Sequence, residues 1–130
     1  MKEIMAIIRI NKINKTRDAL ASEGFPAFTC VKILGRGKGK LKNKVELSNV
    51  VSIEEQDIPK EIAEAMSEED RLLAKRLITL IVPDEEAPKV IDTIINVNKT
   101  GHPGDGKIFV LPINDAIRVR TAEKGNNAII

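Results

Sequence analysis

The chain has 130 residues, and its 21 Lys and Arg nearly balance its 19 Asp and Glu, which leaves a formal net charge of +2. This length predicts one domain, residues 1–130, and so small a net charge does not indicate a nucleic-acid partner. With three Phe, no Trp and no Tyr, the sequence is also poor in the aromatic residues on which single-strand nucleic-acid binders stack bases.

The cysteine content and the hydropathy bound the cellular setting. The single cysteine, Cys30, excludes an internal disulfide and fits a reducing cytoplasm. It stands among apolar residues of an expected strand, where we expect a small buried hydrophobe. No apolar stretch approaches the roughly 20 residues of a membrane span, so we expect a cytoplasmic protein without stable membrane insertion.

The first half of the chain reads as strand, helix and strand. Residues 3–10 are apolar and β-branched, which predicts a strand. Residues 13–24 have helical spacing, with Asn11 or Asn14 as the expected N-cap and Gly24 as the expected end. A second strand is predicted over residues 25–34.

The pattern is weak between Leu41 and Asp70, where only a short strand or a short helix is indicated. So long a connection is expected to be functional or mobile. Its charges are segregated: lysines alternate over residues 38–44, and nine acidic residues against one lysine then run from Glu46 to Asp70. Two interpretations stay open, a solvated self-repelling loop and an acidic tip that recognises a cationic protein surface.

The second half repeats the pattern of the first. A third strand is predicted over residues 71–83, and Asp84 is expected to cap a helix over residues 85–98. Pro88 falls in the first turn of that helix, where its ring does least harm. The glycine-rich loop TGHPGDG then leads into a strand over residues 107–113. A short return strand, AIRVRT, and a polar tail at residues 121–130 are expected to follow.

This order of elements predicts an α+β, ferredoxin-like split βαβ sandwich (βαββαβ) with a long insertion. Residues 6–10 and 78–82 are apolar at consecutive positions, which predicts strands that are buried on both faces. Two helices can cover only one face of the sheet. We therefore predict that the other face meets another subunit in a closed oligomer.

The sequence does not read as that of an enzyme. Its only histidine, His102, has no evident carboxylate or thiol companion, so a surface histidine is favoured over a general base. No hydrolase nucleophile elbow and no metal-ligand spacing is found. The acidic run at residues 84–86 suits a helix start electrostatically and needs no further role. We expect no catalytic and no metal-binding residues.

Anion binding is better supported by the sequence. GRGKGK, residues 35–40, places three cations among glycines, and GDGK, residues 104–107, offers a nest of backbone N–H groups. Arg118 and Arg120 would lie on one side of an extended segment. Together these groups would suit a polyphosphate. Neither glycine stretch matches the P-loop or the dinucleotide-binding fingerprint. A tight hairpin for GDGK and a basic loop that binds RNA phosphates for residues 35–44 remain alternatives.

Over almost its whole length the chain resembles the PII signal-transduction family. The resemblance is carried by the opening MKEIMAIIRINKINKTRDALASEGFPAFT, by GRGK and LIVPDE, and by TGHPGDGKIFV followed by AIRVRT. The combination of EGFPAFTCVKILGRGK, an enlarged loop and VNKTG followed by GDGKIFV most resembles the archaeal-type PII-like proteins associated with nitrogenase, specifically the longer of the two paralogues.

The resemblance implies a non-catalytic nitrogen and energy sensor that forms a trimer or higher ring. ATP or ADP would occupy the clefts between subunits, and 2-oxoglutarate would act as effector. An extended T-loop, about residues 36–73, would regulate a nitrogenase component together with a sister PII-like paralogue. The alternatives are regulation of an ammonium transporter or a nitrogen-assimilation enzyme and, ranked last, an RNA-binding module.

The resemblance also assigns residues by position. Ile7, Thr29, Gly35 and Ile81 would surround adenine and ribose. The phosphates would be held by Gly37, Lys38, Gly104, Asp105, Gly106 and Lys107, with Arg118 and Arg120 from the neighbouring chain. The implied residues for 2-oxoglutarate are Gly37, Lys38, Gly39, Lys40 and Lys75, the last of which would pair with a carboxylate.

The sequence departs from the family at three points. Gly39 stands where the family commonly has a glutamine that helps to hold Mg²⁺ and 2-oxoglutarate, so the sequence leaves open whether either binds. Lys38 replaces an arginine, which loses bidentate phosphate contact. No tyrosine is present for uridylylation. The sequence also leaves open the preference between ATP and ADP and whether the assembly is homomeric or mixed.

Overall fold

The computed structural model describes residues 1–37 and 72–130, which form the predicted order of strands and helices. The elements are β1 (Lys2–Ile8), α1 (Ile13–Ser22), β2 (Thr29–Gly35), β3 (Leu73–Val82), α4 (Ala87–Asn98) and β4 (Lys107–Pro112). The chain divides into two compact units, residues 1–31 with 76–130, and residues 32–75. The expected T-loop, about residues 36–73, lies outside the described residues except at its two ends.

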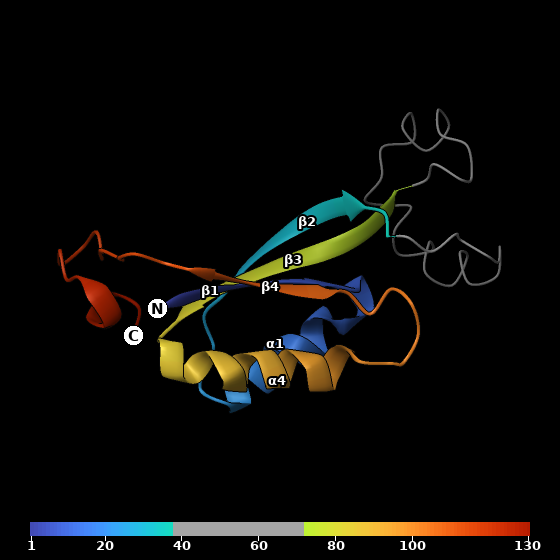
Figure 1. The fold of residues 1–130 in the computed structure, drawn as a ribbon, viewed down its shortest axis with the longest axis horizontal. Coiled ribbons are helices and arrows are strands. Elements are labelled where there is room, and N and C mark those ends of the chain that lie inside the picture. The colour runs from blue at the N-terminus through green and yellow to red at the C-terminus, as the bar shows by residue number, and fades with distance from the viewer. Residues whose placement is uncertain (38–71) are drawn as a thin grey trace. The chain divides into compact units, whose positions relative to one another are not determined.

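The four strands form one sheet in the order β2-β3-β1-β4. β1 pairs antiparallel with both β3 and β4, so that Met5 lies opposite Thr79 on one side and Phe109 on the other. Helices α1 and α4 lie on the same side of this sheet (Figure 1). The predicted ferredoxin-like sandwich is therefore confirmed.

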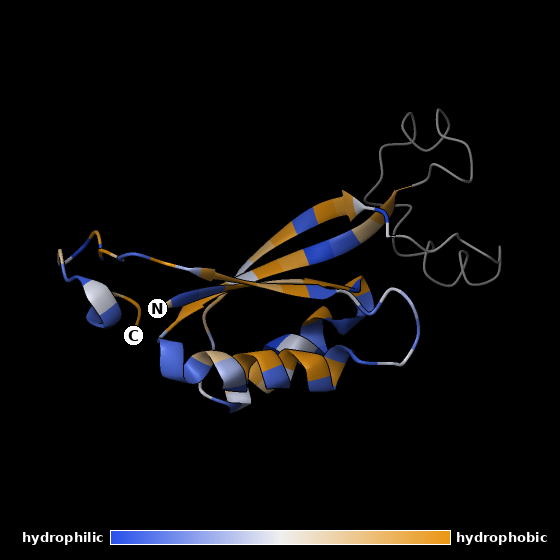
Figure 2. Cartoon of the chain, in the orientation of Figure 1, coloured by the Kyte–Doolittle hydropathy of each residue, from blue (hydrophilic) through white to orange (hydrophobic). Residues whose placement is uncertain are grey.

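The core lies between the sheet and the two helices. Ile4, Ala6 and Ile8 alternate along β1 and are fully buried, as the period of two in a strand requires. They pack against Val90 and Ile94, which are four residues apart on α4 and make its apolar face (Figure 2). Burial of each such side chain contributes about 1.5–3 kcal/mol to stability. Among the described helices, none has the length and apolar character that a bilayer span requires.

A buried polar contact joins α1 to α4. The Thr16 hydroxyl donates to the Lys12 carbonyl at 2.8 Å and accepts from Asn98 Nδ2 at 3.0 Å. The same nitrogen donates to the Ile94 carbonyl at 2.9 Å. Because both partners of Nδ2 are acceptors, the orientation of the Asn98 amide is fixed. This contact sets the position of the last turn of α4, from which the glycine loop starts.

The opposite face of the sheet remains apolar and partly exposed. Phe109 is 49% exposed, and Ile81 and Leu111 are each 38% exposed. Ile81 and Leu111 flank Glu3 across the sheet, and Phe109 flanks Met5. The prediction that the helices cover only one face is thus confirmed. Phe109, one of the three phenylalanines, is thus an exposed aromatic residue of the sheet, although its neighbours are aliphatic.

Both predicted helix caps are wrong. Neither Asn11 nor Asn14 caps α1, because a 3₁₀ turn over Ile10–Lys12 leads into the helix and the N-cap residue, Lys12, makes no side-chain cap bond. Asp84 starts another 3₁₀ turn, Asp84–Glu86, that moves the start of α4 to Ala87. The Asp84 carboxylate lies 3.0 Å from the Met1 amino group, and this hydrogen bond lowers the pKa of Asp84.

The predicted return strand AIRVRT is also wrong. The segment has only an isolated bridge between Ile117 and Lys124, and residues 119–121 form a turn in which Val119 is fully exposed. The Ala122 N–H closes this turn by donating to the Arg118 carbonyl at 2.7 Å. Arg118 and Arg120 therefore do not share one side of an extended segment.

Cys30 is exposed, contrary to the expectation of a buried hydrophobe. β2 begins at Thr29, four residues later than predicted, and it is an edge strand of the sheet. The sequence pattern around Cys30 identified the strand correctly but could not show that it lies at the edge.

Candidate functional site

The glycine loop between α4 and β4 has a backbone that few residues other than glycine can adopt. Gly101, Gly104 and Gly106 all have positive φ, at 85°, 97° and 109°. Gly106 is the most restricted, because a Cβ at this position would lie 1.9 Å from the Ile7 carbonyl oxygen. The close approach of the loop to β1 therefore depends on the missing side chain of Gly106.

The Asp105 carboxylate accepts hydrogen bonds from several groups of this loop and from Arg9. Its Oδ2 accepts from the N–H groups of Thr100 at 2.8 Å and Gly101 at 3.1 Å. Its Oδ1 accepts from the Thr100 hydroxyl and from Arg9 Nη1, the latter at 2.6 Å. Both carboxylate oxygens are thus turned toward the start of the loop and the end of β1.

These bonds keep Asp105 ionised. The hydrogen bond from the Thr100 hydroxyl holds the pKa of Asp105 well below its ordinary value. Desolvation opposes this effect, and the Arg9 guanidinium and the backbone N–H groups of Thr100 and Gly101 add to it. A carboxylate whose pKa is lower in the folded state than in the unfolded state stabilises the protein at pH values above its unfolded-state pKa. That stabilisation is lost as the pH falls through the folded-state pKa. The loop therefore keeps its full set of bonds at neutral pH.

Arg9 joins the end of β1 to the loop. Besides Asp105, its guanidinium donates to the Pro103 carbonyl at 3.1 Å. The sequence interpretation missed Arg9 and Thr100 as parts of the site. The pairing of Ile7 with Lys107 explains why they belong there, since the residues that follow β1 must lie beside the loop that precedes β4. A topology-based reading of the strand order could have found Arg9.

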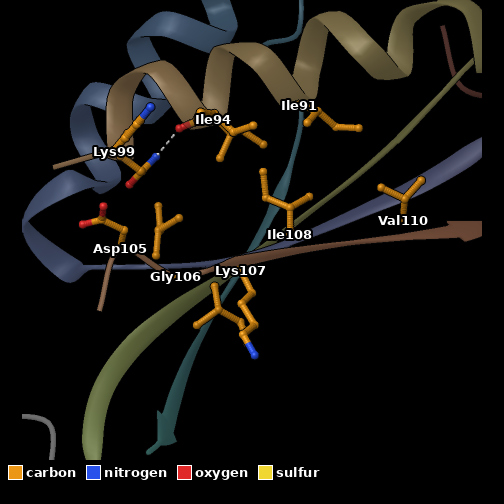
Figure 3. A pocket seen from close by; sticks show the side chains of 12 residues that line it. Ile91, Ile94, Lys99, Asp105, Gly106, Lys107, Ile108 and Val110 are labelled. Atoms are coloured by element: carbon orange, nitrogen blue, oxygen red, sulfur yellow. Dashed lines mark hydrogen bonds between the residues drawn. The ribbon is translucent and has the colours of Figure 1, made fainter. Parts of the chain in front are cut away.

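A pocket of about 420 Å³ lies next to the loop. Ile91 and Ile94 of α4 face Ile108 and Val110 of β4 across it, whereas the Lys107 side chain points to the other side of the strand (Figure 3). The dashed bond in Figure 3 is the one from Asn98 to the Ile94 carbonyl. The oxygen of the same amide, Asn98 Oδ1, has no hydrogen-bond partner among the described residues. Asn98, which lines this pocket, thus has a side-chain oxygen that could accept a hydrogen bond.

The structure brings together some of the predicted site residues. Ile7, Asp105, Gly106 and Lys107 all line this pocket. Ile81 pairs with Glu3, four positions along β1 from Ile7, so these two are not neighbours within one chain. His102 is exposed in the loop, as expected.

The remaining predicted residues are distributed among other segments. Thr29 and Gly35 are the first and last residues of β2, and Gly37 follows that strand. Lys75 lies in β3 and is half-buried. Lys38, Gly39 and Lys40 lie outside the described residues.

Arg118 and Arg120 have different surroundings. The Arg118 guanidinium donates to Glu123 Oε2 at 2.7 Å and to the carbonyls of Asn127 at 3.0 Å and Ile130 at 2.6 Å. It therefore holds the tail, residues 121–130, against its own segment. Arg120 is exposed on the turn.

Comparison with known proteins identifies close relatives of this chain. The family model described as "Nitrogen regulatory protein P-II" matches residues 1–123. The "Nitrogen fixation nifHD region GlnB-like protein 2" of Methanobacterium ivanovii is 46% identical, with all of each chain covered. The protein of the same name from Methanothermococcus thermolithotrophicus is also 46% identical, over 99% of this chain and 98% of that one.

A solved structure agrees with this result. The crystal structure of Arabidopsis thaliana PII bound to citrate has a TM-score of 0.70 and 30% sequence identity to this chain. The match covers 98% of this chain and 88% of the Arabidopsis chain. The resemblance drawn from the sequence motifs is therefore confirmed in sequence and in fold.

Proposed function

This chain belongs to the nitrogen regulatory protein P-II family, and from that premise we propose that it is a non-catalytic sensor of nitrogen and energy status. It binds ATP or ADP, together with 2-oxoglutarate, at the clefts between subunits. Ligand binding changes the T-loop, about residues 36–73, and the T-loop regulates nitrogenase by direct protein–protein contact. A ligand shifts the loop only by as much as it prefers one loop state over the other.

The loop from Thr100 to Lys107 is the observation that supports nucleotide binding most strongly. Asp105 and Arg9 hold its backbone in a conformation with positive φ at Gly104 and Gly106. A backbone of this kind directs successive N–H groups toward an anion, and Lys107 adds a cation at the start of β4. In our proposal these groups hold the phosphates, while Ile7 contacts the adenine.

The exposed sheet face supports the oligomer. An apolar surface that includes Phe109, Ile81 and Leu111 is expected to be covered by protein. In a homotrimer, the neighbouring subunit would cover it and would also bring Arg118 and Arg120 to the nucleotide. A sister PII-like paralogue could take the place of a second copy in a mixed ring.

The names of the relatives support the nitrogenase target. The two nifHD-region proteins take their names from nitrogen fixation. A citrate-bound PII shows that a relative holds a small polycarboxylate, which agrees in chemistry with 2-oxoglutarate as effector. We assign Lys75 to one carboxylate of that ligand and Gly37, Lys38, Gly39 and Lys40 to the loop that surrounds it. Mg²⁺ would accompany the nucleotide phosphates.

The target assignment is tested by affinity capture. The full chain, immobilised, is incubated with extract from nitrogen-fixing cells, with ADP in one sample and with ATP and 2-oxoglutarate in the other. We expect a nitrogenase component to be retained in the first sample and released in the second. Recovery of an ammonium channel or a nitrogen-assimilation enzyme in its place would contradict the nitrogenase assignment and leave the sensor role intact.

A further inference from the structure

The proposed phosphate site contains a carboxylate, which would repel a bound phosphate. Asp105 stands between Gly104 and Gly106, in the part of the loop that would surround an anion. A unit negative charge a few ångströms from a phosphate is repulsive, and the repulsion grows as solvent is excluded. The loop needs a way to keep this charge from the ligand.

We propose that Arg9 is a positioning residue of the anion site, which cancels the charge of Asp105 and turns its carboxylate away from the bound phosphates. This inference rests on the proposed nucleotide-binding function. It gives a role to a side chain that lies 96 residues from its partner in sequence.

Three observations support this role. The shortest contact of the Arg9 guanidinium is 2.6 Å to Asp105 Oδ1, and the two side chains are only 20% and 26% exposed, so solvent screens the pair weakly. The other oxygen, Oδ2, is occupied by the N–H groups of Thr100 and Gly101. The second Arg9 contact, to the Pro103 carbonyl, fixes the guanidinium against the loop backbone rather than leaving it mobile.

The geometry separates two tasks within the loop. The hydrogen bonds of Asp105 to Thr100 and Gly101 shape the turn. Arg9 supplies the positive charge that makes this shape compatible with an anionic ligand. The Lys107 side chain points away from Ile91, Ile94 and Ile108 (Figure 3), and within the described residues the ion pair of Asp105 is made by Arg9 and not by Lys107. Removal of Arg9 would therefore leave the Asp105 charge uncompensated.

Calorimetric titration of the full chain with ATP and with AMP tests this role. Arg9→Met is expected to weaken ATP binding about tenfold, the effect of one unit charge near the phosphates, and to weaken AMP binding less. Arg9→Lys keeps the charge and is expected to stay within about threefold of the wild type. Arg17→Met is the matched control, since Arg17 is exposed on α1 and pairs only with the adjacent Asp18 among the described residues.

The double variant separates charge compensation from simple bracing of the loop. Arg9→Met with Asp105→Asn removes both charges, so ATP affinity should rise again above that of Arg9→Met alone. The deficit of Arg9→Met should also shrink as salt is raised, because screening weakens the repulsion. Melting temperatures of all variants show whether each is folded at the temperature of titration.

Each outcome decides the proposal. If the wild type binds ATP and Arg9→Met binds it equally well, Arg9 has no role in the site. If the double variant is as weak as Arg9→Met at every salt concentration, Arg9 acts only as a structural brace. If the wild type itself binds neither ATP nor ADP, the proposed function fails, and the role of Arg9 fails with it.

Discussion

Replacement of Gly106 by alanine is expected to destabilise the protein by about 2–6 kcal/mol, the largest effect of any single change in the loop. A residue with a Cβ at φ +109° is strained by about 1–3 kcal/mol. The new Cβ would also lie 1.9 Å from the Ile7 carbonyl oxygen, and relief of this overlap with the backbone of β1 costs about 1–3 kcal/mol more. Urea denaturation at one fixed protein concentration measures the difference in the free energy of unfolding.

Gly24→Ala is the matched control for this prediction. Gly24 has φ +94°, but a Cβ there would meet nothing within 4 Å. Only the backbone strain should remain, at about 1–3 kcal/mol. Equal losses of stability in the two variants would show that the approach of Gly106 to β1 does not constrain the loop.

Replacement of Lys107 by alanine is expected to weaken ATP binding by tens-fold. A charge-assisted hydrogen bond contributes about 1.5–3 kcal/mol, and each 1.4 kcal/mol corresponds to about a factor of ten in affinity. Arg118→Ala is expected to have an effect of the same size. It is the less direct test, because Arg118 also holds Glu123 and the carbonyls of Asn127 and Ile130.

Lys15→Ala is the control for the loss of one positive charge, since Lys15 is exposed on α1 and lies outside the proposed site. Calorimetry with ATP and ADP compares the two variants with the wild type. An unchanged affinity in Lys107→Ala would remove Lys107 from the nucleotide site and would leave the loop as a structural turn.

The fold could be predicted because its main signals are periodic. Alternation along β1 and the spacing of Val90 and Ile94 on α4 each point to one buried face. Element boundaries were less predictable, since a 3₁₀ turn and an α-helical start have similar sequences. Asp84 illustrates this: an acidic residue before a helix suggests a cap, but here the carboxylate binds the Met1 amino group instead.

The site was only partly readable from the sequence. The glycines and Lys107 are visible as a motif because they are contiguous. Arg9 is not, since its partner Asp105 becomes a neighbour only through the pairing of β1 with β4. The tail is a further example: RVR alternates as a strand does, yet Arg118 binds tail oxygens and the residues after it turn. Long-range pairing decides these contacts, and local pattern does not encode it.

The central claim is that an adenine nucleotide is held at the seam between copies of this chain. Light scattering, which gives the mass, combined with calorimetric titration with ATP, ADP and 2-oxoglutarate, singly and together, tests it most directly. We predict an assembly of three 14.3-kDa chains that takes up one nucleotide per chain, with 2-oxoglutarate altering the affinity for ATP. A particle that stays at the mass of one chain and releases no heat with either nucleotide would contradict it.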